Sequence, residues 1–265
     1  MLGDGPPIVL LHGVTATRRY VVHGSKALAR RGYRQISYDA RGHGGSGAAP
    51  EGEGYDYPAL VADLTRVLED QCEGTPVLAG HSMGCHTAAA FALQAPERAR
   101  AVVLIGPASA GLPPPEEVLA HWDRLADGME RGGVGGFMEA YEADLAVDAD
   151  WVERVLRITR ERMERHRDPK AMARVLREVP RSLPFDGLVE LESLDLPALV
   201  VASRDDADPG HPYAVAEAWA ASLPQAELVS EAPGESPLAW QGGKLVRAIA
   251  DFCERVGVSP ADPAA

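Results

Sequence analysis

The chain has 265 residues, of which 46% are hydrophobic and 25% charged, a composition that excludes a largely disordered protein. Its formal net charge of −13 argues against nucleic acid or an anionic membrane as partner, because such a surface repels phosphate groups. The three cysteines, Cys72, Cys85 and Cys253, form no C-x-x-C pair, and no apolar run approaches the ~20 residues of a membrane span, so we expect a cytoplasmic protein.

Short aliphatic runs alternate with helix-length segments along most of the chain. The runs cover residues 8–11, 36–38, 77–79, 102–105, 199–201 and, more weakly, 228–229. Helices are expected around residues 16–31, 57–72, 83–95, 212–223 and 238–256. Runs without polar alternation are typical of strands buried on both faces, and strands separated by helices pair in parallel. This order predicts an α/β fold with a mostly parallel central sheet and helices on both faces.

Residues 111–186 interrupt this alternation, because they contain helical periodicity and no strand-like run. We interpret them as a helical cap, or lid, inserted into a core formed by residues 1–110 and 187–258, with a disordered tail at 259–265. Large side chains within this cap could line a substrate pocket together with His12, although such residues are more often core. These candidates are Trp122, Phe137, Met138 and Tyr141.

The strongest chemical signal is the pentapeptide Gly80-His81-Ser82-Met83-Gly84, which follows one predicted strand and precedes an Ala-rich helical segment. A serine on such a sharp turn projects its hydroxyl above the sheet, and side chains at positions 80 and 84 would collide with neighbouring backbone. The start of the next helix offers free amides to a developing negative charge. Ser82 is therefore the candidate nucleophile.

With this elbow, the chain resembles the α/β-hydrolase family over most of its length. Leu10-Leu11-His12-Gly13-Val14 resembles the His-Gly loop of that family, and residues 39–46, DARGHGGS, resemble its D-x-R-G-x-G-x-S loop. The resemblance implies an oxyanion hole made by the amides of Val14 and Met83. We interpret Asp39 and Arg41 as residues that hold the second loop in place.

The same resemblance places the catalytic acid after the strand at 199–201. Aligning Ser203 with the glycine of the family's G-x-x-D pattern selects Asp206, and Asp205 is the alternative register. The family's histidine is expected just before the last helix, but Glu235 stands at that position, and no histidine follows His211. The base of a Ser-His-Asp mechanism is therefore missing from its usual place.

Three interpretations of this departure stay open. His211, five residues after Asp206, could be a replacement base. Glu235 could itself act as the base, because two carboxylates in one dry site raise one pKa. Alternatively, the chain has lost hydrolysis and binds a ligand.

From these features we expect a hydrolase of a small or hydrophobic ester or related acyl compound that acts through an acyl-enzyme on Ser82. A haloperoxidase-like or carbon–carbon hydrolase activity, and a receptor-like ligand-binding protein, are the alternatives. We expect a small-molecule substrate, no cofactor and no metal, because the histidines and acids lack metal-ligand spacing. Members of the family usually begin with a two-strand hairpin, whereas here the His-Gly strand starts by Ile8. Either those two strands are missing from this chain or the family pattern is trimmed here, and an exposed sheet edge would then favour a homodimer.

Overall fold

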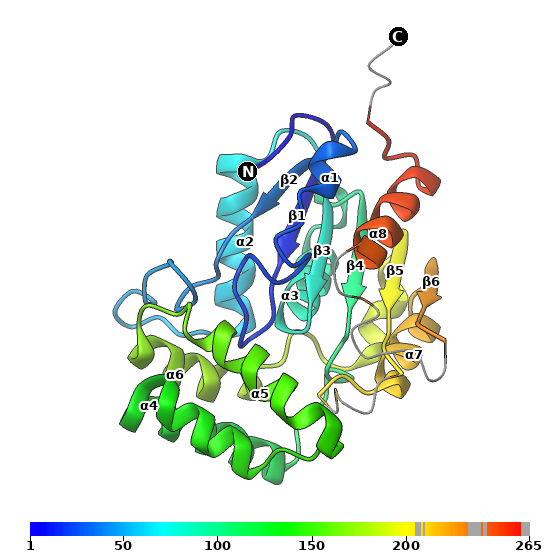
Figure 1. The fold of residues 1–265 in the computed structure, drawn as a ribbon. Helices are drawn as coiled ribbons and strands as arrows, with labels where there is room; N and C mark the ends of the chain where they lie inside the picture. The colour runs from blue at the N-terminus through cyan, green and yellow to red at the C-terminus, as the bar shows by residue number, and fades with distance from the viewer. Residues whose placement is uncertain (205–207, 209, 233–239, 241–242, 261–265) are drawn as a thin grey trace.

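The computed structural model describes residues 1–204, 208, 210–232, 240 and 243–260. It contains one parallel six-stranded sheet in the order β2-β1-β3-β4-β5-β6 (Figure 1). The strands are β1 (Pro7–Leu11), β2 (Arg34–Ser37), β3 (Val77–His81), β4 (Ala101–Ile105), β5 (Ala198–Val201) and β6 (Ala226–Val229). The helices are α1 (Ala27–Arg30), α2 (Tyr57–Gln71), α3 (Met83–Gln94), α4 (Glu116–Ala143), α5 (Ala149–Met163), α6 (Pro169–Glu178), α7 (Tyr213–Ser222) and α8 (Gly243–Arg255).

Both faces of the sheet are covered, as the unbroken aliphatic runs predict. Along β1, Val9 and Leu11 pack in a core with α2, α3 and α7, whereas Ile8 and Leu10 pack in a second core with α1 and α8. All five residues of β1 are buried. Alternate side chains point to opposite faces of a strand, so an aliphatic run is needed wherever both faces carry helices.

One predicted helix is wrong over most of its length. Of residues 16–31, only the four of α1 are helical. The segment before them forms turns that end at His23 and Gly24, whose φ angles of 50° and 71° are left-handed. A right-handed helix cannot pass through two such residues, and this is why the helix-length segment at 16–31 does not form one continuous helix.

The segment from α4 to α6, residues 116–178, packs at the carboxyl end of the sheet. Its buried residues share a core with Ala40, which follows β2, and with Met83, which follows β3. Figure 1 shows these three helices (green) gathered at one end of the sheet. α4 is bent at Gly132 and Gly133, where the backbone leaves the helical conformation. Among the described helices, none is both long and apolar enough to cross a bilayer.

Candidate active site

Ser82 lies at the turn between β3 and α3 with φ 52° and ψ −118°, a conformation that residues other than glycine rarely adopt. A Cβ on Gly80 would overlap the carbonyl group of Gly84, and a Cβ on Gly84 would overlap that of Leu11. The Ser82 amide donates to the carbonyl oxygen of Ile105 in β4 at 3.0 Å. The strained turn predicted from the pentapeptide is therefore present, and its two glycines are required by backbone contacts.

The two amides predicted for an oxyanion hole lie on either side of this turn. Met83 is the first residue of α3, and Val14 follows Gly13 in the loop after β1. A Cβ on Gly13 would lie 3.0 Å from His81 Nδ1 and 3.1 Å from Ser82 Cβ, so this loop passes directly against the elbow. Within the described residues, neither amide donates a hydrogen bond. Both N–H groups are therefore without a protein acceptor within the part of the chain that the structure describes.

His211 lies beside the elbow and forms a pair with Asp208. Its Nδ1 is 2.8 Å and 2.9 Å from the two carboxylate oxygens of Asp208. The His211 ring is centred 5.0 Å from that of His81, and its Cγ is 3.3 Å from where a Cβ on Gly106 would lie. Gly106 directly follows Ile105, the residue that accepts the Ser82 amide. A histidine oriented by a carboxylate therefore lies against His81, the residue that precedes the candidate nucleophile.

Asp208 is a residue that the sequence reasoning did not select as the acid. Burial would raise the pKa of Asp208, but the charge of His211 and its hydrogen bond lower that pKa to about 2. The side chain stays ionised at neutral pH and can stabilise a protonated imidazole. The three-residue spacing between Asp208 and His211 is the signal that would have found this pair. Asp206, Asp205 and Glu235 lie outside the described residues.

A second carboxylate, Glu231, organises the ends of β5 and β6. It is 5% exposed and accepts hydrogen bonds from the Ser203 hydroxyl at 2.7 Å, the Arg204 amide at 2.6 Å and the Trp240 indole at 3.0 Å. Burial would raise the pKa of Glu231, but these donors hold it below its ordinary value. Glu231 therefore acts as an acceptor that holds the chain entering the Asp208 loop.

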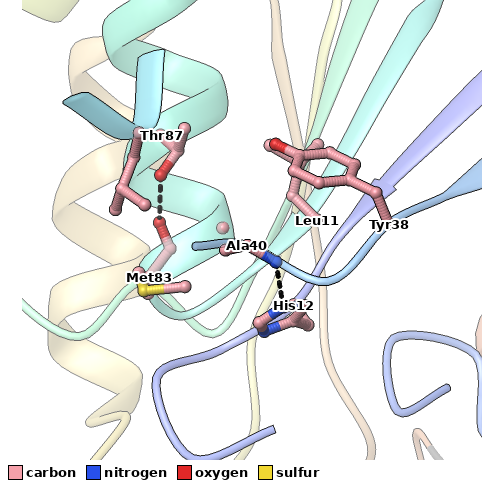
Figure 2. Close-up of a pocket in the computed structure, with 8 residues that line it drawn as sticks. Leu11, His12, Tyr38, Ala40, Met83 and Thr87 are labelled. Atoms are coloured by element: carbon pink, nitrogen blue, oxygen red, sulfur yellow. Dashed lines mark hydrogen bonds between the residues drawn. The ribbon is translucent and has the colours of Figure 1, made fainter. Parts of the chain in front are cut away.

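A small pocket lies next to the elbow, lined by the end of β1, the segment that follows β2, one residue of α2 and the start of α3 (Figure 2). Its lining is Leu11, His12, Tyr38, Ala40, Leu60, Met83, Gly84 and Thr87. The volume of about 10 Å³ holds a single water molecule and no acyl group. His12, a predicted pocket residue, is here bound to the Ala40 amide, as Figure 2 shows.

The other predicted pocket residues lie in the core of the α4–α6 segment. Phe137 and Met138 are 0% and 3% exposed, and Trp122 and Tyr141 pack against the same cluster. Phe137 and Tyr141 stack with ring centres 5.9 Å apart. Their helical spacing reflects core packing in the described structure, and none of the four lines the pocket next to the elbow.

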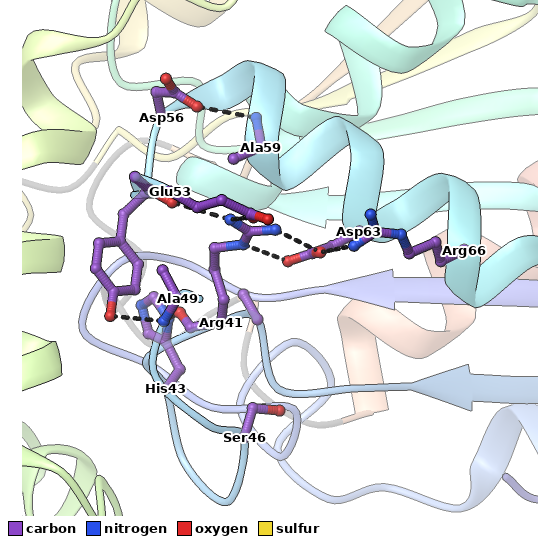
Figure 3. A network of polar contacts seen from close by, with 12 residues as sticks. Arg41, His43, Ser46, Ala49, Glu53, Asp56, Ala59, Asp63 and Arg66 are labelled. Atoms are coloured by element: carbon purple, nitrogen blue, oxygen red, sulfur yellow. Dashed lines mark hydrogen bonds and ion pairs between the residues drawn. The ribbon is translucent and has the colours of Figure 1, made fainter. Parts of the chain in front are cut away.

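The second loop, residues 39–46, is held by the two residues predicted to do so, Asp39 and Arg41. The guanidinium of Arg41 donates to both carboxylate oxygens of Asp63 at 2.6 Å and 2.7 Å, and to Glu53 at 2.8 Å (Figure 3). Asp39 accepts from the Arg18 amide at 2.8 Å and from the Gly45 amide at 3.0 Å. This network ties the loop to α2, and its histidine, His43, is buried against the loop after β1.

We expect the free energy of unfolding to fall as the pH is lowered from about 7 to 4. Burial lowers the pKa of His81 to about 3 and the pKa values of His86 and His166 to about 4. Unfolded histidine titrates near ~6.5, so between these values the unfolded chain binds protons that the native state does not. Each histidine then removes up to about 1.4 kcal/mol of stability per pH unit of acidification.

Urea unfolding at a series of pH values measures this slope. His166→Gln is expected to make it shallower by about one histidine's share. An unfolding free energy that stays constant between pH 6.5 and 4 would contradict the neutral state of these rings in the folded chain.

Comparison with known proteins identifies the family. The sequence model of the alpha/beta hydrolase fold family matches residues 6–242. The chain belongs to this family. The resemblance inferred from the three motifs, and the α/β-hydrolase fold that it implies, are thus confirmed.

Individual relatives of this α/β hydrolase cover it in part. An sn-1-specific diacylglycerol lipase ABHD11 of Xenopus laevis is 37% identical over 102 residues, which are 38% of this chain and 32% of that protein. Epoxide hydrolase B of Mycobacterium tuberculosis is 36% identical over 108 residues, 41% of this chain and 30% of that protein. The chain spans about a third of the length of the curated relatives it matches.

A solved structure covers nearly the whole chain. The thermophilic esterase from Thermogutta terrifontis superposes with a TM-score of 0.78 and 26% identity, over 96% of this chain and 92% of that one. These three proteins are named as a lipase, an epoxide hydrolase and an esterase. Their names support a hydrolase activity for this α/β hydrolase.

Proposed function

We propose that the chain hydrolyses a small or hydrophobic ester through a covalent acyl-enzyme on Ser82. The observation that carries this proposal is the strained backbone of Ser82 at the turn between β3 and α3, with φ 52°. Such strain costs about 1–3 kcal/mol and persists where it serves to project a reactive group. The esterase and lipase named among the relatives support the same class of reaction.

In the first half of the proposed reaction, Ser82 Oγ attacks the ester carbonyl carbon. A carbon–oxygen bond forms, and the serine proton passes to Nε2 of His211, whose Nδ1–H donates to Asp208. The negative charge moves to the carbonyl oxygen, where the amides of Val14 and Met83 stabilise it. The intermediate collapses when the alcohol leaves with the proton from His211.

In the second half, His211 takes a proton from water, and the resulting hydroxide attacks the acyl carbon. The tetrahedral intermediate collapses, Ser82 recovers its proton from His211, and a carboxylic acid is released. His211 replaces the histidine that the family usually carries at the position of Glu235. The pairing of His211 with Asp208, beside the elbow, is what favours it over the other described histidines.

Labelling with a fluorophosphonate tests the proposal directly, because only an activated serine displaces the fluoride. We expect rapid, stoichiometric modification of the wild-type chain, located by mass spectrometry on the peptide that contains Ser82, and none in Ser82→Ala. Folded wild-type protein that stays unmodified would overturn the proposal and favour a ligand-binding protein without catalysis. Circular dichroism of the same samples confirms that the chain is folded.

A further inference from the structure

Three buried imidazoles face three successive carbonyl oxygens of the loop after β1. His12 Nδ1 lies 2.9 Å from the Gly13 oxygen, His43 Nε2 lies 2.9 Å from the Val14 oxygen, and His166 Nε2 lies 3.3 Å from the Thr15 oxygen. The rings meet edge to face, with centres 4.8 Å apart between the first two and 5.6 Å between the last two. They come from three distant parts of the chain. We call them the histidine ladder.

The other contacts of the ladder assign its hydrogens. His12 Nε2 accepts from the Ala40 amide at 2.9 Å, so its proton is on Nδ1 and donates to Gly13. His166 Nδ1 accepts from the Gly44 amide at 3.0 Å, so its proton is on Nε2 and donates to Thr15. Both rings are therefore neutral, in agreement with the lowering of their pKa values by burial.

His43 is shared between two carbonyl groups. Its Nδ1 lies 2.8 Å from the Arg41 oxygen and its Nε2 lies 2.9 Å from the Val14 oxygen. A neutral ring has one N–H and donates to one of the two. The ring itself is fully buried and packed between its two neighbours in the ladder.

These contacts set the direction of the Val14 amide. A trans peptide unit is planar, and its N–H points opposite to its C=O. The hydrogen bond from His12 to the Gly13 oxygen therefore aims the Val14 N–H, and the bond from His166 to the Thr15 oxygen holds the end of the same short loop. The ladder thus donates to the carbonyl oxygens of Gly13 and Thr15, and its middle ring lies 2.9 Å from that of Val14, on the loop that carries a candidate oxyanion donor.

The last member of the ladder belongs to the junction of α5 and α6. Three further contacts attach this junction to the core. The Arg167 amide donates to the Gly44 oxygen at 3.2 Å, Tyr20 Oη donates to the Glu161 oxygen at 3.4 Å, and Arg165 Nε donates to Tyr20 Oη at 3.0 Å. The junction is therefore docked on both loops that surround Val14.

We propose that His166 is a positioning residue, through which the α5–α6 junction holds the Val14 amide in the geometry of an oxyanion hole. This inference rests on the proposed function, because it needs an oxyanion to stabilise. It predicts that the α4–α6 segment contributes to the rate of the chemical step at a residue that does not touch the substrate. An oxyanion donor displaced by a fraction of an ångström loses much of its effect.

His166→Phe, which keeps a planar ring and removes both polar atoms, tests this role. With p-nitrophenyl acetate we expect kcat to fall about 10-fold and KM to change less than about 2-fold, because the lost interaction acts in the transition state. Affinity for trifluoroacetophenone, whose serine adduct carries an oxyanion, should fall in parallel with kcat/KM. Unchanged kcat and inhibitor affinity in the folded variant would overturn the inference.

Two amide variants separate positioning from simple packing, and they decide the question if His166→Phe does not fold. Glutamine can place its amide nitrogen near the position of Nε2 and asparagine near that of Nδ1. His166→Gln is therefore expected to keep the donor to Thr15 and to be at least about 5-fold more active than His166→Asn. Equal activity of these two variants would contradict a role for the Thr15 contact.

Arg177→Gln is the matched control for loss of stability in the same segment. Arg177 binds Glu130 at 2.8 Å on α4 and contacts neither loop around Val14. The Arg177→Gln substitution should lower the melting temperature and leave kcat unchanged. Failure of fluorophosphonate to label the wild-type chain would instead refute the proposed function, which distinguishes the two failures.

Discussion

Replacement of Ser82 by alanine is expected to lower kcat for p-nitrophenyl acetate by at least about 10³-fold, because no other group can form the acyl-enzyme. The variant keeps a Cβ and therefore the unfavourable backbone conformation of φ 52° and ψ −118°. Its melting temperature should stay close to that of the wild type. Steady-state hydrolysis and fluorophosphonate labelling measure the loss.

Ser82→Gly separates the chemical role of this residue from its backbone strain. Glycine adopts positive φ without the steric cost of a Cβ, which is about 1–3 kcal/mol for other residues. Against this, glycine loses about 0.5–1 kcal/mol through the greater freedom of its unfolded chain. We therefore expect Ser82→Gly to be as inactive as Ser82→Ala but more stable by about 1 kcal/mol in urea unfolding. A glycine variant less stable than the alanine variant would show that the turn is not strained.

The second large effect is expected at the base. His211→Gln should lower kcat/KM about 10²- to 10⁴-fold, because the glutamine side chain cannot accept and return the proton of Ser82. Asp208→Asn should lower it by about 10² or more, because the imidazole loses the carboxylate 2.8 Å from Nδ1 that stabilises its charged form. Hydrolysis of p-nitrophenyl acetate at saturating and limiting substrate measures both.

A matched pair elsewhere in the chain controls for the loss of any histidine–aspartate contact. His121 Nδ1, in α4, lies 2.8 Å from the carboxylate of Asp144, the residue that follows this helix, and this is the same distance as in the His211 pair. His121→Gln is expected to leave kcat/KM unchanged. Loss of activity to a similar extent would mean that the effect at His211 is not specific.

Glu235→Gln tests the rival base. If His211 transfers the proton, this variant should keep kcat/KM within about 3-fold of the wild type. Activity abolished by Glu235→Gln and retained by His211→Gln would overturn the assignment of His211. That result would identify Glu235, at the position where the family usually has histidine, as the base.

The elements that were predicted correctly are those determined by local patterns. The aliphatic runs form strands, because a strand that carries helices on both faces of the sheet needs apolar side chains on both faces. The long amphipathic segments form α2, α4, α5 and α6. The expected helix at 16–31 was wrong except at residues 27–30, because the preceding segment forms turns and the left-handed residues His23 and Gly24 do not fit a right-handed helix. Periodicity records which side chains are apolar and does not record the φ angles that a turn requires.

Length, composition and charge limit the class of protein and its partners. The sequence alone also predicts the α/β fold and the elbow around Ser82. The elbow follows from the spacing of two glycines around one serine, and the fold class from the alternation of aliphatic runs with helix-length segments. Only the tertiary structure decided that Asp208 binds His211 beside the elbow, because the family pattern points to Asp206 instead.

The histidine ladder could not be found from the sequence either. His12, His43 and His166 are separated by up to about 150 residues, and none has a spacing relation to the others. Folding brings them together because the loops after β1 and β2 meet at one end of the sheet, where the α5–α6 junction docks on both. The order of residues along the chain does not show which loops will lie together, because this is determined by how the helices pack against the sheet.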